Sequence, residues 1–283
     1  MVVDEQFVAR VDAILREVAR TEILPRFGRL ERDEIVEKGP GDLVTVADRA
    51  AEAALSARLT ALWPGSQVVG EETVFTDPSV LEALEGADPV WIIDPIDGTS
   101  NYATANARFS VLVALAREGE LLASWIYVPW FDRMARAVRG GGAFLDGARL
   151  QVAAAPDPAA GLRDLEVAVS RPRFWTPVAR TAITALSTHG VSMFYSDGAG
   201  LEYLAMAEGR RSSALMVWEN VWDHAAGLLL HAEAGGASVC SDGAPFRLAG
   251  GNALPFAVAP DPATARALIA GCANRLERPE PAA

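Results

Sequence analysis

Residues 91–102 read WIIDPIDGTSNY, and in this stretch an apolar segment meets a pair of acidic residues. The three bulky apolar residues at its start are typical of the end of a buried strand. Pro95 has no backbone N–H and cannot continue a central strand, so we expect the sheet to end there. Asp94 and Asp97 would then point into one cavity, with the carbonyl of Ile96 directed to the same place.

Oxygen ligands of this kind suit Mg²⁺, Mn²⁺ or Ca²⁺ rather than zinc. Gly98 allows the backbone to approach a ligand closely, and we expect Thr99 to cap a following helix whose free N–H groups would face a phosphate. An EF-hand calcium loop is excluded, because its first and third positions would fall on Ile93 and Pro95. A strand-ending turn without a ligand stays open as the alternative, since Asp-Gly is common in turns.

Four blocks of the chain, in this order and spacing, resemble the inositol monophosphatase family over residues from about 5 to about 270. They are DLVTVAD at 42–48, GEE at 70–72, DPIDGT at 94–99, and WDHAAG at 222–227 running on to EAGG at 233–236. The resemblance implies an α/β, layered αβαβα sandwich of the inositol monophosphatase and fructose-1,6-bisphosphatase type. It also implies a Mg²⁺-dependent, lithium-sensitive phosphomonoesterase and a homodimer.

The same resemblance assigns metal ligands. Glu71, Asp94 and the carbonyl of Ile96 would hold one Mg²⁺ ion, and Asp94, Asp97 and Asp223 would hold a second. A third, weaker ion would bind Glu71 and water, and Mn²⁺ is a possible substitute.

Phosphate monoesters are negatively charged and hydrolyse very slowly, so a catalyst has to neutralise developing charge and position a water molecule. Two metal ions roughly 3.5 to 4 Å apart can hold the attacking and leaving oxygens of one displacement.

For catalysis, the resemblance implies a group made of Asp48, Thr99 and Glu71. Thr99, hydrogen-bonded to Asp48, would orient and help to deprotonate the metal-activated water that attacks phosphorus. Backbone N–H groups of Gly98 and Thr99 would bind phosphate oxygens. Substrate contacts are expected from Asp97, Ala199 and Lys38.

Each block also has a purely structural interpretation. Thr45 and Asp48 fit a helix capping box, and sequence spacing alone would favour the cap. Adjacent glutamates such as Glu71 and Glu72 are usually a solvated face. Asp223 falls in the first turn of a predicted helix, where the helix dipole favours a carboxylate.

The chain departs from the family pattern where the substrate would be recognised. The usual Gly-Ser or Gly-Thr before a helix is replaced by Asp197-Gly198, and a later Gly-Arg-x-Asp pattern appears as GRRS at 209–212. The acidic residue that contacts inositol hydroxyls falls on Met216, with Glu219 close by. A site for a polyol should keep such partners. We therefore expect a small phosphorylated metabolite: an inositol-phosphate-like ester, histidinol phosphate, a sugar phosphate or a nucleotide 3′-phosphate, with inositol 1-phosphate itself disfavoured.

The composition limits the function further. A formal net charge of −12 over 283 residues argues against nonspecific binding to nucleic acid or to an anionic membrane. No apolar run is long enough to span a bilayer, and the N-terminus has no signal-peptide pattern, so we expect a cytoplasmic protein. The 2 cysteines and 3 histidines form no zinc pattern, and packed or solvent-facing side chains are the better interpretation.

Apolar periodicity and turn residues predict alternating elements and two domains. We expect residues 1–152 to form an N-terminal α+β domain that carries most metal ligands, and 153–274 a C-terminal α/β domain that supplies Asp223 and substrate contacts. Residues 275–283 would be a loose tail. Residues 38–41 are expected to form a loop. Helices are predicted over 4–24, 45–62 and 222–234, and strands over 67–69, 109–116, 121–128, 134–138, 143–145, 148–152, 165–169, 191–195, 214–217, 237–240 and 256–259.

Two other functions are compatible with these residues. The chain could be a regulatory protein that retains the metal site and binds a macromolecular partner. It could also be a metal-dependent phosphate binder without turnover. The intact set of acidic residues favours the enzyme.

Overall fold

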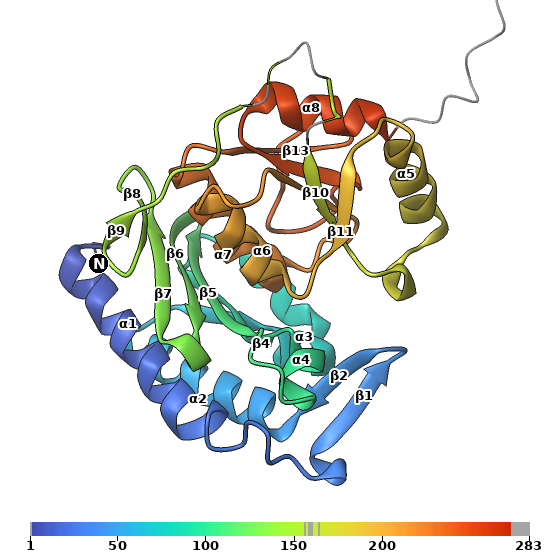
Figure 1. The fold of residues 1–283 in the computed structure, drawn as a ribbon. Helices are drawn as coiled ribbons and strands as arrows, with labels where there is room; N and C mark the ends of the chain where they lie inside the picture. Colours follow the sequence, from blue (N-terminus) through green and yellow to red (C-terminus); the bar gives the residue numbers. More distant parts are fainter. Residues whose placement is uncertain (1, 156, 158–160, 164, 273–283) are drawn as a thin grey trace, which may run out of the picture.

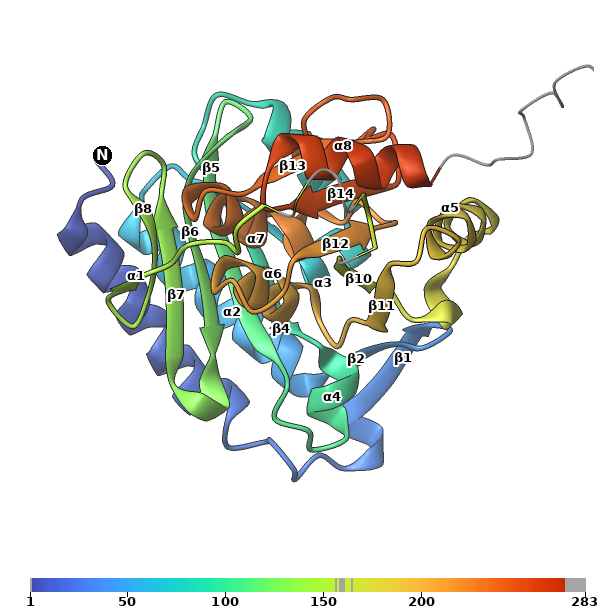
Figure 2. The same cartoon turned by 45° about the horizontal axis from the view of Figure 1, so that its top comes forward.

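The computed structural model describes residues 2–155, 157, 161–163 and 165–272. In this part of the chain, helices and sheets alternate in five layers, which Figure 1 and Figure 2 show from two sides. The expected layered αβαβα sandwich is confirmed. No helix among the described residues is both long and apolar enough to cross a membrane.

The larger sheet has seven strands in the order β3-β4-β5-β6-β7-β8-β9. Strands β3 and β4 are parallel, and each later pair is antiparallel. The bounds are Gln67–Gly70 for β3, Val90–Asp97 for β4, Ser110–Arg117 for β5, Glu120–Val128 for β6, Arg133–Val138 for β7, Gly142–Leu145 for β8 and Ala148–Arg149 for β9. The strand predicted over 148–152 is therefore shorter than expected.

Helices α1 (Glu5–Val18) and α2 (Val46–Leu62) cover the outer face of this sheet. The helical pattern predicted to reach residue 24 continues after α1 as a π-helical segment, Ala19–Ile23. Because strand side chains alternate, Trp91 and Ile93 pack under the two helices, whereas Ile92 points to the opposite face. Both faces of β4 are thus buried.

The smaller sheet has five strands in the order β11-β10-β12-β14-β13. Its strands are Glu166–Val169 (β10), Ser192–Tyr195 (β11), Ser213–Met216 (β12), Ala237–Cys240 (β13) and Phe256–Ala259 (β14). Helices α6 (Ala199–Ala207) and α7 (Val221–Glu233) lie between the two sheets and share one core with both. Helices α5 (Pro177–Ser187) and α8 (Pro262–Gly271) cover the outer face.

Short elements surround the edge of the larger sheet where β4 ends. A hairpin of β1 (Ile35–Gly39) and β2 (Asp42–Thr45) precedes α2, so the loop predicted over 38–41 is wrong for Lys38 and Gly39, which belong to β1. Helix α3 (Glu71–Thr76) follows β3, and α4 (Thr99–Ala103) follows β4. Short 3₁₀ helices are Arg32–Glu34, Pro78–Glu85, Pro129–Phe131 and Pro172–Phe174.

The expectation that the strand ends before Pro95 is wrong. Strand β4 continues to Asp97, and the pairing of Asp94 with Leu112 and of Asp97 with Ser110 leaves one extra residue on β4. This irregularity is a β-bulge, a place where a strand tolerates a proline because a ladder hydrogen bond is already missing. The bulge brings both aspartates to the rim of the sheet without ending it.

The boundary expected between residues 152 and 153 falls between the two sheets. Because α6 and α7 pack against both sheets in a single core, the division into domains 1–152 and 153–274 stays a prediction. The tail predicted at 275–283 lies outside the described residues.

Candidate metal centre

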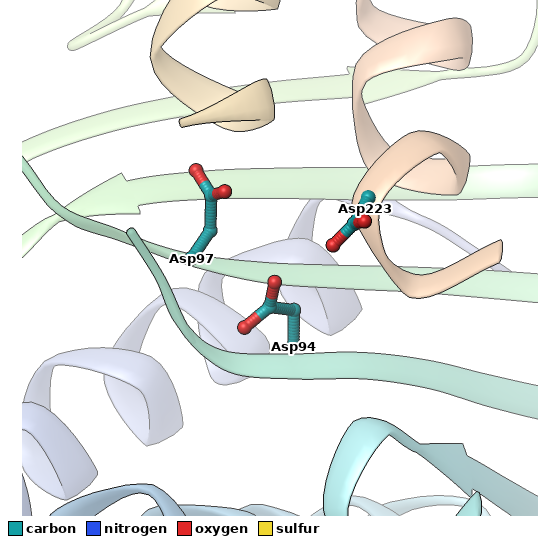
Figure 3. A group of neighbouring side chains, drawn as sticks. All are labelled: Asp94, Asp97 and Asp223. Carbon is teal, nitrogen blue, oxygen red and sulfur yellow. The ribbon is translucent and has the colours of Figure 1, made fainter. Parts of the chain in front are cut away.

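Three aspartates that are distant in sequence meet between the two sheets (Figure 3). Asp94 and Asp97 come from the bulged end of β4, and Asp223 comes from the first turn of α7. One carboxylate oxygen of each lies within 4.8 Å of one oxygen of each of the others. The predicted ligands Asp94, Asp97 and Asp223 therefore form one cluster.

Each carboxylate of the cluster is held by neighbouring donors. The N–H of Ile96 donates to Asp94 Oδ1 at 3.0 Å, across the bulge. Asp223 Oδ2 accepts from the indole Nε1 of Trp218 at 2.6 Å. Because these donors fix the side chains before any ligand binds, the oxygens are preorganised for a cation.

Asp97 is fixed by the beginning of α6. Its Oδ1 accepts from the N–H of Ala199 at 3.0 Å, and its Oδ2 accepts from the N–H of Gly200 and the hydroxyl of Ser110, both at 2.9 Å. A Cβ at Gly200 would lie 2.6 Å from Ser110 Oγ, and one at Gly198 would lie 2.8 Å from Asp97 Oδ2. The unusual sequence around Ala199 thus lets the helix approach the carboxylate closely. Ala199, expected to contact substrate, donates its N–H to Asp97, and its contact with substrate stays a prediction.

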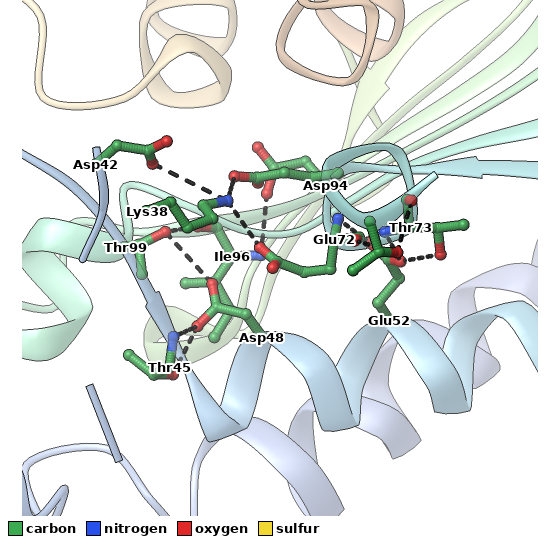
Figure 4. Close-up of polar contacts among 12 residues, drawn as sticks. Lys38, Asp42, Thr45, Asp48, Glu52, Glu72, Thr73, Asp94, Ile96 and Thr99 are labelled. Atoms are coloured by element: carbon green, nitrogen blue, oxygen red, sulfur yellow. Dashed lines mark hydrogen bonds and ion pairs between the residues drawn. The ribbon is translucent and has the colours of Figure 1, made fainter. Parts of the chain in front are cut away.

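Glu71, another predicted ligand, is the first residue of α3 and is not part of the three-aspartate cluster. Its Oε1 accepts from the ammonium of Lys38 at 2.6 Å, and Glu72 Oε1 accepts from the same ammonium at 3.0 Å. The Lys38 side chain is only 4% exposed. Figure 4 shows the Lys38 side chain reaching the acidic groups. The adjacent glutamates are therefore not a solvated face.

Asp48, Thr99 and Ile96 are connected beside the cluster (Figure 4). The hydroxyl of Thr99 donates to Asp48 Oδ1 at 3.3 Å and to the carbonyl of Ile96 at 3.0 Å. The other carboxylate oxygen of Asp48 accepts from the N–H of Thr45 at 2.8 Å. The predicted capping box of Thr45 and Asp48 is confirmed, and the same carboxylate also reaches Thr99.

The expectation that Thr99 caps α4 is wrong, because the N-cap is Gly98 and Thr99 is the first helical residue. Gly98 has φ +89°, a conformation that favours glycine. It turns the chain from β4 into α4 and frees the Thr99 hydroxyl to reach Asp48. The N–H of Thr99 lies in the first turn of a helix, where it has no acceptor within the helix.

Burial and mutual repulsion shift the acids of the cluster. Burial raises the pKa of Asp94 well above its usual range, and the charges of Glu71 and Asp97 raise it further. Burial and the charge of Asp97 raise the pKa of Asp223 to about 7. Burial likewise raises the pKa of Asp97, although donors from Ser110 and α6 oppose the shift. Burial is thus the main cause of all three shifts, and repulsion between carboxylates adds to the pKa values of Asp94 and Asp223.

The flanking groups are shifted as well. Burial raises the pKa of Glu71 to about 8, opposed by Lys38 and reinforced by Asp223. Burial raises the pKa of Asp48 to about 6, opposed by its hydrogen bonds from Thr45. Burial would lower the pKa of Lys38, but the charges of Glu71 and Glu72 outweigh it and the net shift is upward.

These donors fit Mg²⁺. All three clustered groups are carboxylates, the carbonyl of Ile96 is adjacent, and hard divalent cations prefer such oxygens. A cation would also relieve the repulsion that adds to the raised pKa values of Asp94 and Asp223. The two histidines considered for zinc, His224 and His231, are packed in the core, at 0% and 2% exposure.

One residue that the sequence did not single out supports the site. The carboxylate of Glu52 accepts from the N–H groups of Glu72 and Thr73, each at 2.8 Å, and from the Thr73 hydroxyl at 2.6 Å (Figure 4). It thereby caps α3, which begins with Glu71. The available signal was its position four residues after Asp48 on the same helix, which puts both on one helical face.

The fold and this centre define an αβαβα protein with a buried carboxylate cluster between its sheets. The chain belongs to the inositol monophosphatase family, whose model matches residues 3–273. It is 34% identical over 237 residues to an inositol-1-monophosphatase of Mesorhizobium japonicum, covering 81% of this chain and 83% of that protein. It is 34% identical over 224 residues to the Nus factor SuhB of Pseudomonas aeruginosa, covering 74% and 78%. The solved extragenic suppressor protein suhB of Bartonella henselae superposes with a TM-score of 0.78 at 26% identity, covering 96% of this chain and 100% of that chain.

Proposed function

We propose that the protein is a metal-dependent phosphoric monoester hydrolase that uses Mg²⁺ to cleave a small phosphorylated metabolite. The observation that carries this proposal is the meeting of Asp94, Asp97 and Asp223 next to the Thr99–Asp48 hydrogen bond. Asp94, Asp97, Asp223, Glu71 and the Ile96 carbonyl would hold the ions. When bound, Mg²⁺ would offset the charge of the phosphate and make a water molecule more acidic.

Asp48, acting through Thr99, would accept the proton of the attacking water. The Thr99 hydroxyl points to Asp48 Oδ1 at 3.3 Å, so Asp48 can accept a proton through it. The raised pKa of Asp48, about 6, suits a general base near neutral pH. The N–H groups of Gly98 and Thr99 would bind phosphate oxygens, because they open α4 beside the carboxylates.

The proposed substrate class follows from the two positions, Met216 and Glu219, where an acidic contact to inositol would be expected. Met216 lies buried in β12, and the nearby Glu219 uses its carboxylate to accept from the N–H and the side-chain amide of Asn252, at 2.8 and 3.0 Å. Met216 offers the hydroxyls of inositol no hydrogen-bond partner, and Glu219 directs its Oε2 to Asn252. A sugar phosphate, histidinol phosphate or another small ester is favoured over inositol 1-phosphate.

Hydrolysis by the Asp94→Asn variant tests the proposal. We expect Mg²⁺-dependent release of phosphate from a panel of monoesters by the wild type and a loss of at least about a hundredfold in the variant, since the cluster loses a charged ligand. Asp33→Asn, which changes an exposed aspartate outside the site, is the matched control. Equal rates for wild type and Asp94→Asn would refute a hydrolase built on these residues. Inhibition of the wild type by Li⁺ is a second, inexpensive measurement.

A regulatory role is the second candidate, because the chain is 34% identical to a relative named Nus factor SuhB. In that case the protein would retain the metal site but would act by binding a macromolecular partner. A stoichiometric partner in affinity purification, retained by Asp94→Asn together with normal growth of cells carrying that variant, would favour this role over the enzyme.

Two further properties stay predictions. A homodimer, which the family resemblance implies, would be detected by light scattering of the purified protein. A cytoplasmic location would be checked by cell fractionation.

A further inference from the structure

Three arginines gather beside the loop that we propose binds phosphate. Arg171 donates to Asp197 Oδ1 at 2.7 Å, and Arg108 Nη2 lies 2.9 Å from Asp197 Oδ2. Arg173 Nη2 is 3.4 Å from the hydroxyl of Ser100, the residue after Thr99. We call Arg108, Arg171 and Arg173 the arginine cluster.

The arginine cluster is tied to the proposed phosphate loop at the backbone. The side-chain amide of Asn101, in α4, donates to the carbonyl of Arg108 at 2.8 Å and to the carbonyl of Asp197 at 2.9 Å. The same two carbonyls lie under Gly98, where an added Cβ would be 3.1 Å from one and 3.4 Å from the other. The backbone of Arg108 and of Asp197 is therefore held against α4, and Asp197 lies two residues before Ala199, whose N–H donates to Asp97.

Arg173 also lies against the β1–β2 hairpin. A Cβ at Gly41, in the turn between β1 and β2, would lie 3.2 Å from its Cδ and Nε, and its guanidinium stacks on Phe174 at 4.6 Å. Figures 1 and 2 show the β1–β2 hairpin, α4 and the segment before α5 facing one another at this end of the molecule. Residues of three separate chain segments thus surround one side of the site.

The positive charge of the arginine cluster is only partly neutralised by neighbouring carboxylates. Asp197 is shared by Arg108 and Arg171, and within the described part of the chain no carboxylate lies at salt-bridge distance from Arg173. The side chains of Arg108 and Arg171 are 57% and 46% exposed. A guanidinium carries five N–H donors in a planar fork that matches carboxylate and phosphate oxygens, so most donors of the cluster are available to a ligand. Such a patch is unexpected in a chain of net charge −12.

We propose that the arginine cluster selects phosphate monoesters that carry a second anionic group, a phosphate or a carboxylate, at the end away from the scissile phosphate. This proposal rests on the proposed function and names its substrate class. The scissile phosphate would bind at the carboxylate centre, and the second anion would bind the exposed guanidinium groups. Asp197 would orient Arg108 and Arg171 for that contact.

Matched substrate pairs test the proposal. Purified protein with Mg²⁺ is assayed on glucose 1-phosphate against glucose 1,6-bisphosphate, and on glycerol 2-phosphate against 2-phosphoglycerate, which separates a second phosphate from a second carboxylate. We expect a KM at least about tenfold lower for the two-anion ester of one pair, comparable to one charged hydrogen-bonded contact.

Variants of the cluster make the result specific. Arg171→Ala and Arg173→Ala should raise KM for the two-anion ester about tenfold and leave kcat and the one-anion KM within about twofold. Arg210→Ala, which removes an exposed arginine paired with Glu208, is the matched control and should change neither. The proposal is overturned by equal KM values within both pairs, or by variants that weaken both esters alike, as a structural ion pair would. If none of the four esters is hydrolysed, the proposed phosphatase function is refuted, and the proposed substrate class is refuted with it.

Discussion

The carboxylate of Glu52 lies directly against the Cα of Gly70, so that a Cβ added to Gly70 would be 2.4 Å from Glu52 Cδ. Real Cβ atoms essentially never come that close, so any other residue at the start of the GEE block would displace the Glu52 side chain. The close approach lets Glu52 reach the N–H groups of Glu72 and Thr73 and cap α3. The Glu52 carboxylate thereby fixes the backbone at the start of α3, and with it the direction of the Glu71 side chain.

Replacing Gly70 by alanine should therefore damage metal use. The new Cβ would push Glu52 away, release the first turn of α3 and displace Glu71. We expect the Mg²⁺ concentration for half-maximal activity to rise about tenfold or more, as for other residues that orient metal ligands. Titration of activity with Mg²⁺ measures the effect. Gly39→Ala, where a Cβ would meet nothing within 4 Å, provides the control.

A double-mutant cycle separates this contact from a general loss of structure. Once Glu52 has been changed to alanine, the additional change Gly70→Ala should cost little, because nothing remains to clash with it. Strong coupling between the two sites is expected. Fully additive effects on Mg²⁺ dependence would contradict the positioning role of Glu52.

The Thr99 hydroxyl is expected to act in turnover rather than in metal binding. Thr99→Val keeps the shape of the side chain and removes the bond to Asp48. We expect kcat to fall about a hundredfold or more, within the range of general acid–base effects, with little change in Mg²⁺ affinity. Steady-state kinetics at several Mg²⁺ concentrations distinguish the two parameters. A variant that lost Mg²⁺ affinity and kept its kcat at saturating metal would contradict this role.

Mg²⁺ should stabilise the fold. Asp94, Asp97 and Asp223 repel one another in a buried cluster, so a cation that binds only the native state relieves the repulsion and adds about 2.7 kcal/mol at one hundred times its dissociation constant. Thermal unfolding with and without Mg²⁺ measures the shift. Asp223→Asn should abolish the shift and, in EDTA, should unfold no earlier than the wild type. An unchanged Mg²⁺ shift in Asp223→Asn would exclude this cluster as the binding site.

Acid should destabilise the protein through His231. Burial lowers the pKa of His231 to about 4, although its bond to the carbonyl of Ala259 opposes the shift. In the unfolded chain the usual value is about 6.5. Between pH 6.5 and 5 the histidine of the unfolded state goes from half to almost full protonation while that of the native state stays largely neutral, so the free energy of unfolding drops by about 1.6 kcal/mol.

Denaturant unfolding at both pH values checks this expectation. His231→Gln should lose about 1.6 kcal/mol less than the wild type over that interval, because glutamine does not titrate. His224 is present in both proteins and cancels in the comparison. His189→Gln is the control, since that histidine is not buried. Identical losses in wild type and His231→Gln would show that another group dominates.

Much of the fold follows from local sequence patterns. Strands β5 and β6 and helices α2 and α7 were predicted to within two residues, because apolar alternation and capping residues act locally. The bulge in β4 was not predicted. A proline usually ends a central strand, and only the register of β4 against β5 decides that one extra residue is accommodated instead. Helix α3 was missed because its stability comes from Glu52, a residue nineteen positions earlier.

The amino-acid sequence by itself determined the family, the layered fold class and the acidic residues available to bind a metal, because motifs and periodicity are properties of the chain read in order. Only the tertiary structure decided which of these acids meet. Asp223 is 126 positions from Asp97, and their approach depends on how α6 and α7 pack between the two sheets. The pairing of Lys38 with Glu71, the support from Glu52 and the arginine cluster were decided in the same way, because each joins segments that are brought together only by the folded core.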